Sequence, residues 1–195
     1  MQVTKKHFPV VGLLSLVLIG VAAGSIYYYQ FVTPHARECG APVHRIIFLE
    51  AIIEEQGGFS ISSAAVLNQT GSTPPVATNQ TSSALNFTGV QFSNYTVTNP
   101  RVIEANAGDT ITIYMLSVNG SSPQWPPTPP ARGLGHGLGV DQFTIPKPLQ
   151  LVTWDKWGST SFTVAREGVS TFRCLHDCSP QHGSMTGTVV VSGCA

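Results

Sequence analysis

Short runs of alternating apolar and polar residues follow one another from residue 94 to the end of the chain. They read YTVTN, RVIEANAGDTITIYMLSVN, TSFTVAREGVSTFRC and GTVVVSG, with Gly, Pro or Asn between them. A period of two places alternate side chains on one face of a strand. Ile111, Ile113 and Met115 should therefore share one face, as should Phe162 and Val164. The pattern predicts an all-β domain over residues 94–195, built as a small Greek-key sandwich or barrel.

Residues 34–93 have a different texture. The run RIIFLEAIIEE, residues 45–55, places its apolar residues on one helical stripe, which predicts a short amphipathic helix. That stripe consists of Ile46, Leu49, Ile52 and Ile53. Residues 57–93 are rich in Gly, Ser, Thr, Asn and Pro, a composition typical of a linker or a glycan-bearing stalk. We therefore predict no independent domain between residues 34 and 93.

An apolar segment near the N-terminus is long enough to cross a bilayer. No charged side chain occurs from Phe8 to Pro34, and Phe8 to Ile26 would span about 28 Å as a helix. Two lysines precede it and three tyrosines follow it, which predicts a cytoplasmic N-terminus. A cleaved signal peptide is the alternative, but the apolar run is longer than a typical signal core. We expect a transmembrane anchor over residues 1–33 and a single-pass protein of the cell membrane.

Asparagine supports a location outside the cell for the remainder of the chain. Five of the seven asparagines open an N-glycosylation sequon: Asn68, Asn79, Asn86, Asn94 and Asn119. Ten basic residues balance ten acidic ones, and charged residues make up only 10% of the chain. This composition does not indicate nucleic-acid binding. It fits a glycoprotein domain on the extracytoplasmic face of a membrane.

The segment CLHDCSPQHGSM, residues 174–185, concentrates soft ligands. Three residues separate Cys174 from Cys178, three separate Cys178 from His182, and two separate His182 from Met185. Thiolate and thioether favour copper, and imidazole suits copper as well. A disulfide between the two cysteines is the alternative in an oxidising compartment. The added histidine and methionine favour a metal site.

This spacing resembles the dinuclear copper A centre of subunit II of haem-copper oxidases, whose site is completed by an earlier histidine followed by Gly or Ser. GHGLGV offers His136 for that position, and the likeness covers roughly Asn94 to Ser192. The resemblance implies a cupredoxin-like fold with two copper ions, while haem belongs to a partner subunit. It implies as metal ligands His136, Cys174, the main-chain carbonyl of His176, Cys178, His182 and Met185.

The resemblance also implies different roles within this ligand set. Cys174 and Cys178 would bridge both coppers, while His136 and His182 would bind one copper each. Met185 and the His176 carbonyl would be weak ligands. Most long members of the family have a glutamate at the position of His176, and its side chain helps to hold a magnesium ion. Because this chain has a histidine there, the resemblance does not imply a magnesium site. In this family an aspartate is often found three residues before the first histidine, and Gly133 occupies that position here.

The function implied is electron entry into a membrane terminal oxidase. Subunit II accepts electrons from an external donor, a cytochrome c or a small blue copper protein, and passes them to haem in subunit I, where oxygen is reduced. It is part of an oxidoreductase but not catalytic alone. The alternatives are a copper A subunit of a nitric oxide reductase and, from another class, a membrane-tethered copper carrier. We expect the donor to dock on a surface framed by Leu138, Pro180, Met185 and the PQWPPTPP loop that carries Trp125.

Two cysteines remain outside the ligand segment. Cys39 and Cys194 lie at opposite ends of the part that follows the anchor, and a disulfide between them is allowed outside the cell. Closing so long a loop would stabilise the fold by about 5 kcal/mol in the chain-entropy model. We expect this pair to be bonded.

Overall fold

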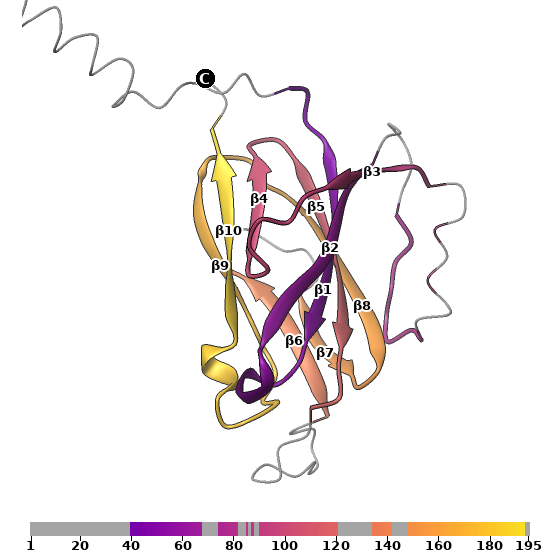
Figure 1. Ribbon diagram of the computed structural model, residues 1–195, viewed down its shortest axis with the longest axis vertical. Helices are drawn as coiled ribbons and strands as arrows, with labels where there is room; N and C mark the ends of the chain where they lie inside the picture. Colours follow the sequence, from indigo (N-terminus) through magenta and orange to yellow (C-terminus); the bar gives the residue numbers. More distant parts are fainter. Residues whose placement is uncertain are drawn as a thin grey trace, which may run out of the picture. The chain divides into compact units, whose positions relative to one another are not determined.

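The protein is a two-sheet β structure (Figure 1). The computed structural model describes residues 40–67, 74–81, 85, 87, 90–120, 134–141 and 148–193, all within the compact unit Glu38–Ala195. The strands of the described residues are β1 (His44–Ala51), β2 (Phe59–Leu67), β3 (Phe92–Tyr95), β4 (Val102–Asn106), β5 (Thr110–Ser117), β6 (Gly135–Val140), β7 (Leu149–Thr153), β8 (Lys156–Thr163), β9 (Gly168–Arg173) and β10 (Thr186–Ser192). Two short 3₁₀ turns, η2 (Glu54–Gln56) and η4 (His182–Ser184), complete the described elements. The all-β prediction is confirmed.

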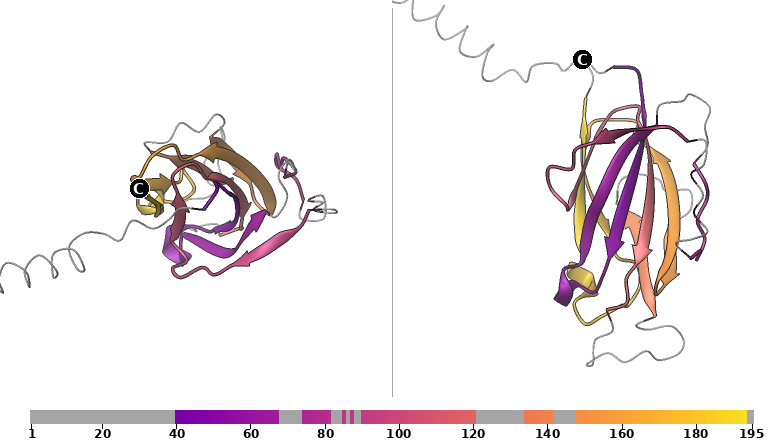
Figure 2. Two further views of the ribbon diagram at one scale, coloured as in Figure 1. Left: turned by 90° about the horizontal axis from the view of Figure 1, so that it is seen from above. Right: turned by 45° about the vertical axis from the view of Figure 1, so that its right-hand side comes forward.

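Each sheet has five strands. The first has the order β3-β2-β1-β5-β8 and the second β4-β10-β9-β6-β7. Strand pairs are antiparallel except for β1 with β5 and β4 with β10, which are parallel. Figure 2 shows the first sheet curving around the second. The strands predicted from alternation appear as β4, β5, β8, β9 and β10, whereas β6 and β7 were not predicted as strands. The strand predicted for the run YTVTN, residues 95–99, is wrong, because β3 ends at Tyr95.

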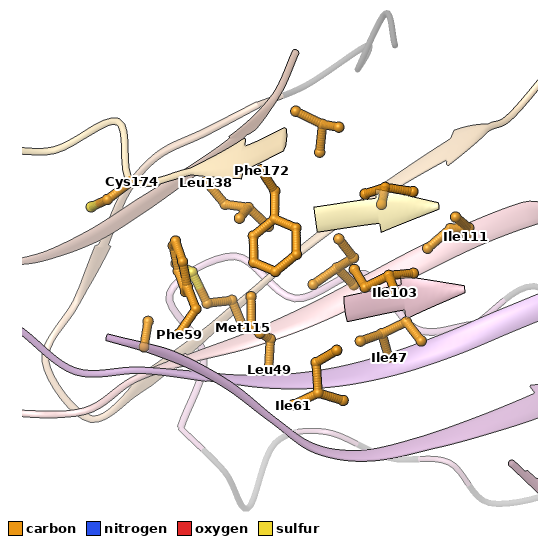
Figure 3. Close-up of a cluster of buried hydrophobic side chains, with 14 of the residues drawn as sticks. Ile47, Leu49, Phe59, Ile61, Ile103, Ile111, Met115, Leu138, Phe172 and Cys174 are labelled. Carbon is orange, nitrogen blue, oxygen red and sulfur yellow. The ribbon is translucent and has the colours of Figure 1, made fainter. Parts of the chain in front are cut away.

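The core lies between the two sheets. One cluster of buried side chains combines residues of the first sheet, such as Leu49 and Ile111, with residues of the second, such as Phe172 and Leu138 (Figure 3). In β10, buried side chains alternate with partly exposed ones, as expected when only one face meets the core. The residues predicted to share a face are buried: Ile111, Ile113, Met115, Phe162 and Val164.

The helix predicted over residues 45–55 is wrong, because β1 occupies most of this segment. β1 lies in the middle of its sheet, with β2 on one side and β5 on the other. Its apolar residues face both ways: Ile46 packs outward, while Ile47 and Leu49 face the core. A strand buried on both faces has a nearly continuous apolar run, which periodicity cannot distinguish from a short helix. This segment forms a strand because it pairs with β5, which is distant in sequence.

The linker predicted over residues 57–93 is also wrong in part, since β2 and β3 belong to the first sheet. Between them, the described residues of 74–90 cover the outer face of that sheet. The Tyr114 hydroxyl donates to the Pro75 carbonyl, and the main chains of Ala77 and Ser159 are hydrogen-bonded. An aromatic cluster fills the contact: Phe48, Phe87, Phe92, Tyr114 and Trp157. The segment is polar in composition but uses its few apolar residues for packing.

A buried ion pair lies where β1 and β5 begin. The Asp109 carboxylate is 1% exposed and accepts a hydrogen bond from Arg45 Nε at 2.7 Å. It also accepts bonds from the main-chain N–H groups of Val43 and Asn106, at 2.8 and 2.9 Å. Arg45 in turn lies over the Tyr95 ring. Because every partner of this carboxylate is internal, the pair connects three segments: the start of β1, the turn between β4 and β5, and β3 through Tyr95.

Several predictions concern residues outside the described ones: the anchor over residues 1–33, the pair Cys39 and Cys194, the sequons at Asn68 and Asn86, and the PQWPPTPP loop that carries Trp125. In the part of the chain that is described, no helix is long and apolar enough to cross a membrane. Of the remaining sequons, Asn79 and Asn119 are exposed, and Asn94 lies in β3.

Candidate metal centre

His136 is the second residue of β6 and is fully buried. Glycines flank it, and the register between β6 and β7 shifts between His136 and Leu138. A Cβ on Gly137 would lie 2.8 Å from the carbonyl oxygens of Leu149 and Gln150, so β6 approaches β7 more closely than other residues allow. Irregularities of this kind re-aim a side chain. The local sequence GHG therefore directs the imidazole inward.

The two cysteines and the methionine lie in the connection between β9 and β10, the ligand loop, residues 174–185. A main-chain hydrogen bond from Cys174 N to Met185 O, 3.1 Å long, closes the loop at its base. The side chains of Cys174, Cys178 and Met185 are 6%, 0% and 0% exposed. Figure 3 shows Cys174 at one end of the buried cluster, next to Leu138. The loop thus turns its sulfur atoms into the interior.

Four predicted ligands converge. The Sγ atoms of Cys174 and Cys178 are 3.8 Å apart, and Cys178 Sγ lies 4.0 Å from Met185 Sδ. A ring nitrogen of His136 and the two Sγ atoms all lie within 4.8 Å of one another. The segments are brought together by pairing of β6 with β9. Nothing in the local sequence specifies that pairing.

The geometry fits a metal ion and not a disulfide. A disulfide bond is about 2.0 Å long, far shorter than the 3.8 Å between the two Sγ atoms. Metal–thiolate bonds are about 2.3 Å long. If one ion were bonded to both sulfurs at this separation, the sulfur–metal–sulfur angle would be about 110°, which is the tetrahedral value. Neither ring nitrogen of His136 has a hydrogen-bond partner among the described residues, although both are buried. A buried imidazole without a partner is costly unless a ligand completes it.

The two thiols titrate as a pair. The hydrogen bond from the Cys178 thiol lowers the pKa of Cys174, against the opposing effect of burial. The same pairing and burial raise the pKa of Cys178. The two sulfurs therefore share a proton, and the pair loses its first proton more readily than an isolated thiol does. A cation that binds both sulfurs would displace that proton.

The other two predicted ligands lie on the rim of the cluster. The His176 carbonyl is 3.3 Å from Cys174 Sγ and accepts the N–H of Cys178 at 2.7 Å, so it faces the sulfurs. The His182 side chain is 33% exposed and is not part of the His136 cluster. Its Nε2 lies 3.1 Å from Asp177 Oδ1, and its Nδ1 lies 3.2 Å from the Ser179 carbonyl.

The surface near the site differs from the predicted docking surface. Leu138 and Met185 are fully buried and cannot frame it, because both point into the core. Pro180 is exposed as expected. The exposed large apolar residues near the ligands are instead Leu134 and Leu175, at 36% and 37%. Alternation in a strand could have identified Leu138 as inward, but β6 was not recognised as a strand.

Trp154 is a contact that sequence reasoning missed. Its ring lies edge-on to the His136 ring, with centroids 5.0 Å apart and an interplanar angle of 72°. Trp154 follows β7, and its main-chain N–H donates to the Leu134 carbonyl just before β6. The tryptophan therefore packs against the candidate ligand and restricts the orientation of its ring.

Comparisons with known proteins are distant. No family model and no curated protein matches the chain. Among solved structures, copper nitrite reductase from Nitrosomonas europaea is 16% identical with a TM-score of 0.42, over 77% of this chain and 42% of that one. A heme-copper terminal oxidase dimer is 10% identical with a TM-score of 0.42, over 96% of this chain and 100% of that one. Auracyanin B is 12% identical with a TM-score of 0.37, over 79% and 92%.

This chain therefore spans less than half of the nitrite reductase. Likenesses with such low TM-scores do not carry a functional conclusion. The residues of the site must carry it instead.

Proposed function

We propose that this chain is the copper A subunit of a membrane terminal oxidase, which accepts electrons from an external donor and passes them to haem in a partner subunit. The observation that carries the proposal is the convergence of His136, Cys174, Cys178 and Met185, with the two Sγ atoms 3.8 Å apart. Two copper ions held by this set and by His182 would supply a one-electron redox centre.

The residues of the chain hold such a centre rigidly. Antiparallel pairing of β9 with β10 fixes both ends of the ligand loop, and β6 fixes His136. Because His136, Cys178 and Met185 are fully buried, water is excluded from the inner side. A rigid, dry site changes little in geometry between two redox states, and this favours fast electron transfer. His182, which is partly exposed, offers the route by which a donor approaches.

The same burial argues against a copper carrier. A carrier must exchange its ion with a partner, which requires ligands that a partner can reach. Cys178 and Met185 are fully buried here, and Cys174 is 6% exposed. A nitric oxide reductase would use the same centre, so the gas consumed by the purified complex decides between the two. Consumption of oxygen supports the oxidase.

The test of the centre is spectroscopic and uses the full chain in detergent. Loaded protein should bind two coppers, absorb in the visible through thiolate charge transfer, and give a delocalised seven-line resonance spectrum. Cys174→Ser and Cys178→Ser should each abolish that spectrum, because each removes a thiolate that would hold the copper ions. Met185→Leu should retain both coppers with a shifted potential, since a weak ligand mainly tunes redox energy. A four-line spectrum from wild-type protein would contradict the proposal.

We also propose a membrane anchor over residues 1–33, with the β unit on the extracytoplasmic face and a disulfide between Cys39 and Cys194. Alkylation without reduction, followed by mass spectrometry, tests the disulfide. Two alkylated thiols at these positions would exclude it. Protease protection of the N-terminus in sealed vesicles tests the topology.

A further inference from the structure

The His136 imidazole lacks the polar partner that usually orients a metal-binding histidine. Such histidines commonly donate their second ring N–H to a carboxylate, a carbonyl or water, and this bond fixes the ring. His136 is fully buried, yet neither of its ring nitrogens has a hydrogen-bond partner among the described residues. A ring that can rotate faces its metal only part of the time and is a weaker ligand. Another contact must therefore hold this ring.

The ring of Trp154 makes such a contact with His136. The two centroids are 5.0 Å apart and the interplanar angle is 72°, which is the edge-to-face arrangement that aromatic pairs favour. Trp154 is half-buried and packs against the main core cluster. The indole is therefore held by the core on one side and limits rotation of the imidazole on the other.

The backbone fixes the position of Trp154. Trp154 and Asp155 form the turn between β7 and β8, and Asp155 has a φ of 58°, in the left-handed region. Among residues other than glycine, mainly Asn, Asp and His adopt that region. Trp154 N–H donates to the Leu134 carbonyl at 3.2 Å, just before β6, which carries His136. Asp155 N–H donates to the Ser117 carbonyl at 2.6 Å, at the end of β5. The turn is thus attached to two other strands.

We infer that Trp154 is a positioning residue: its indole keeps the His136 imidazole directed toward the two cysteines, and the turn at Asp155 sets the position of the indole. This inference rests on the proposed function. Packing of an aromatic ring here takes the place of the usual hydrogen bond. Sparsely populated backbone conformations such as that of Asp155 cluster at functional sites, where the surrounding structure maintains them.

The first experiment changes Trp154 in the full chain in detergent. Trp154→Leu should lower copper affinity roughly 10-fold, the lower end of the effect of removing an outer partner of a metal ligand. It should also broaden the nitrogen hyperfine lines of the His136 ligand in the resonance spectrum, because the ring no longer has one orientation. Trp154→Phe retains an aromatic ring and should keep most of the affinity.

The same exchange at Trp157 is the matched control. Trp157 lies in β8, and its ring packs on Phe48 in the cluster on the outer face of the first sheet, with centroids 6.2 Å apart. Trp157→Leu and Trp154→Leu should both lower the midpoint of thermal unfolding, since both remove apolar packing. Only Trp154→Leu should change copper affinity and the hyperfine lines. A merely structural role for Trp154 predicts that the two variants bind copper alike at temperatures where both are folded.

The second experiment tests the turn. Asp155 is exposed, so its side chain can be changed without loss of packing. Asp155→Gly adopts a positive φ readily and should bind copper with wild-type affinity. Asp155→Val disfavours that conformation, because a β-branched residue is strained there, and the turn must shift. Its copper affinity should therefore fall as it does in Trp154→Leu.

The outcomes separate the two proposals. If wild-type protein fails to bind two coppers, the proposed function falls and this inference falls with it. If wild type binds two coppers but Trp154→Leu matches Trp157→Leu in affinity and hyperfine lines, only the inference is overturned. Wild-type affinity in Asp155→Val would overturn the role of the turn.

Discussion

Replacing Gly137 by alanine tests whether the close approach of β6 to β7 positions His136. The added Cβ would lie 2.8 Å from the carbonyl oxygens of both Leu149 and Gln150, and 3.0 Å from Leu175 Cβ. Two of these neighbours are main chain, so the strands themselves must separate. Gly183 in η4 is the matched control, because a Cβ there would meet nothing within 4 Å.

The expected magnitude follows from the difference between the two variants. Both gain equally from the reduced backbone freedom of the unfolded chain, so Gly183→Ala and Gly137→Ala differ by the steric cost alone. Overpacking a filled site costs about 1–3 kcal/mol. For a chain of this size, that lowers the midpoint of thermal unfolding by about 2–12 °C. Copper affinity should fall as well, since His136 moves with β6.

Thermal unfolding followed by circular dichroism, together with copper titration, measures both effects in the full chain. Gly183→Ala should unfold at the wild-type temperature or slightly above it and bind copper normally. If Gly137→Ala matched Gly183→Ala in both assays, the packing of β6 against β7 would not position the imidazole, and our account of the GHG sequence would be refuted.

Three further predictions concern other parts of the described structure. Asp109→Ala and Arg45→Met should each lower the free energy of unfolding by about 3–5 kcal/mol, because each leaves the charge of the other partner buried without its counter-ion; denaturant titration measures both. Copper loading should quench tryptophan fluorescence, since the Trp154 ring lies 5.0 Å from that of His136, and Trp154→Phe should lose most of the quench. In metal-free protein the lowered pKa of Cys174 contributes stability that is lost as the pH falls from its unfolded value of 9.0 through the lower folded value, while above 9.0 the raised pKa of Cys178 acts in the opposite direction. Cys174→Ser should flatten that pH dependence in thermal unfolding, and an unchanged slope would contradict it.

The sequence alone determined what depends on residues close together in the chain. The alternating runs predicted strands that appear as β4, β5, β8, β9 and β10, because side-chain direction in a strand follows directly from position. The ligand loop could also be identified, since two cysteines, a histidine and a methionine within residues 174–185 can meet without help from distant residues. Residue chemistry alone restricted the metal to one that accepts sulfur ligands.

Only the tertiary structure decided what depends on residues far apart. The run over residues 45–51 is compatible with helix or strand, and parallel pairing with β5 made it β1. Residues 57–93 looked like a linker, yet the described residues of 74–90 cover the aromatic outer face of the first sheet. His136 meets Cys174 and Cys178 because β6 pairs with β9, and Trp154 meets His136 because β6 pairs with β7. Strand pairing and burial depend on the free energy of the whole fold, so a short stretch of sequence does not specify them.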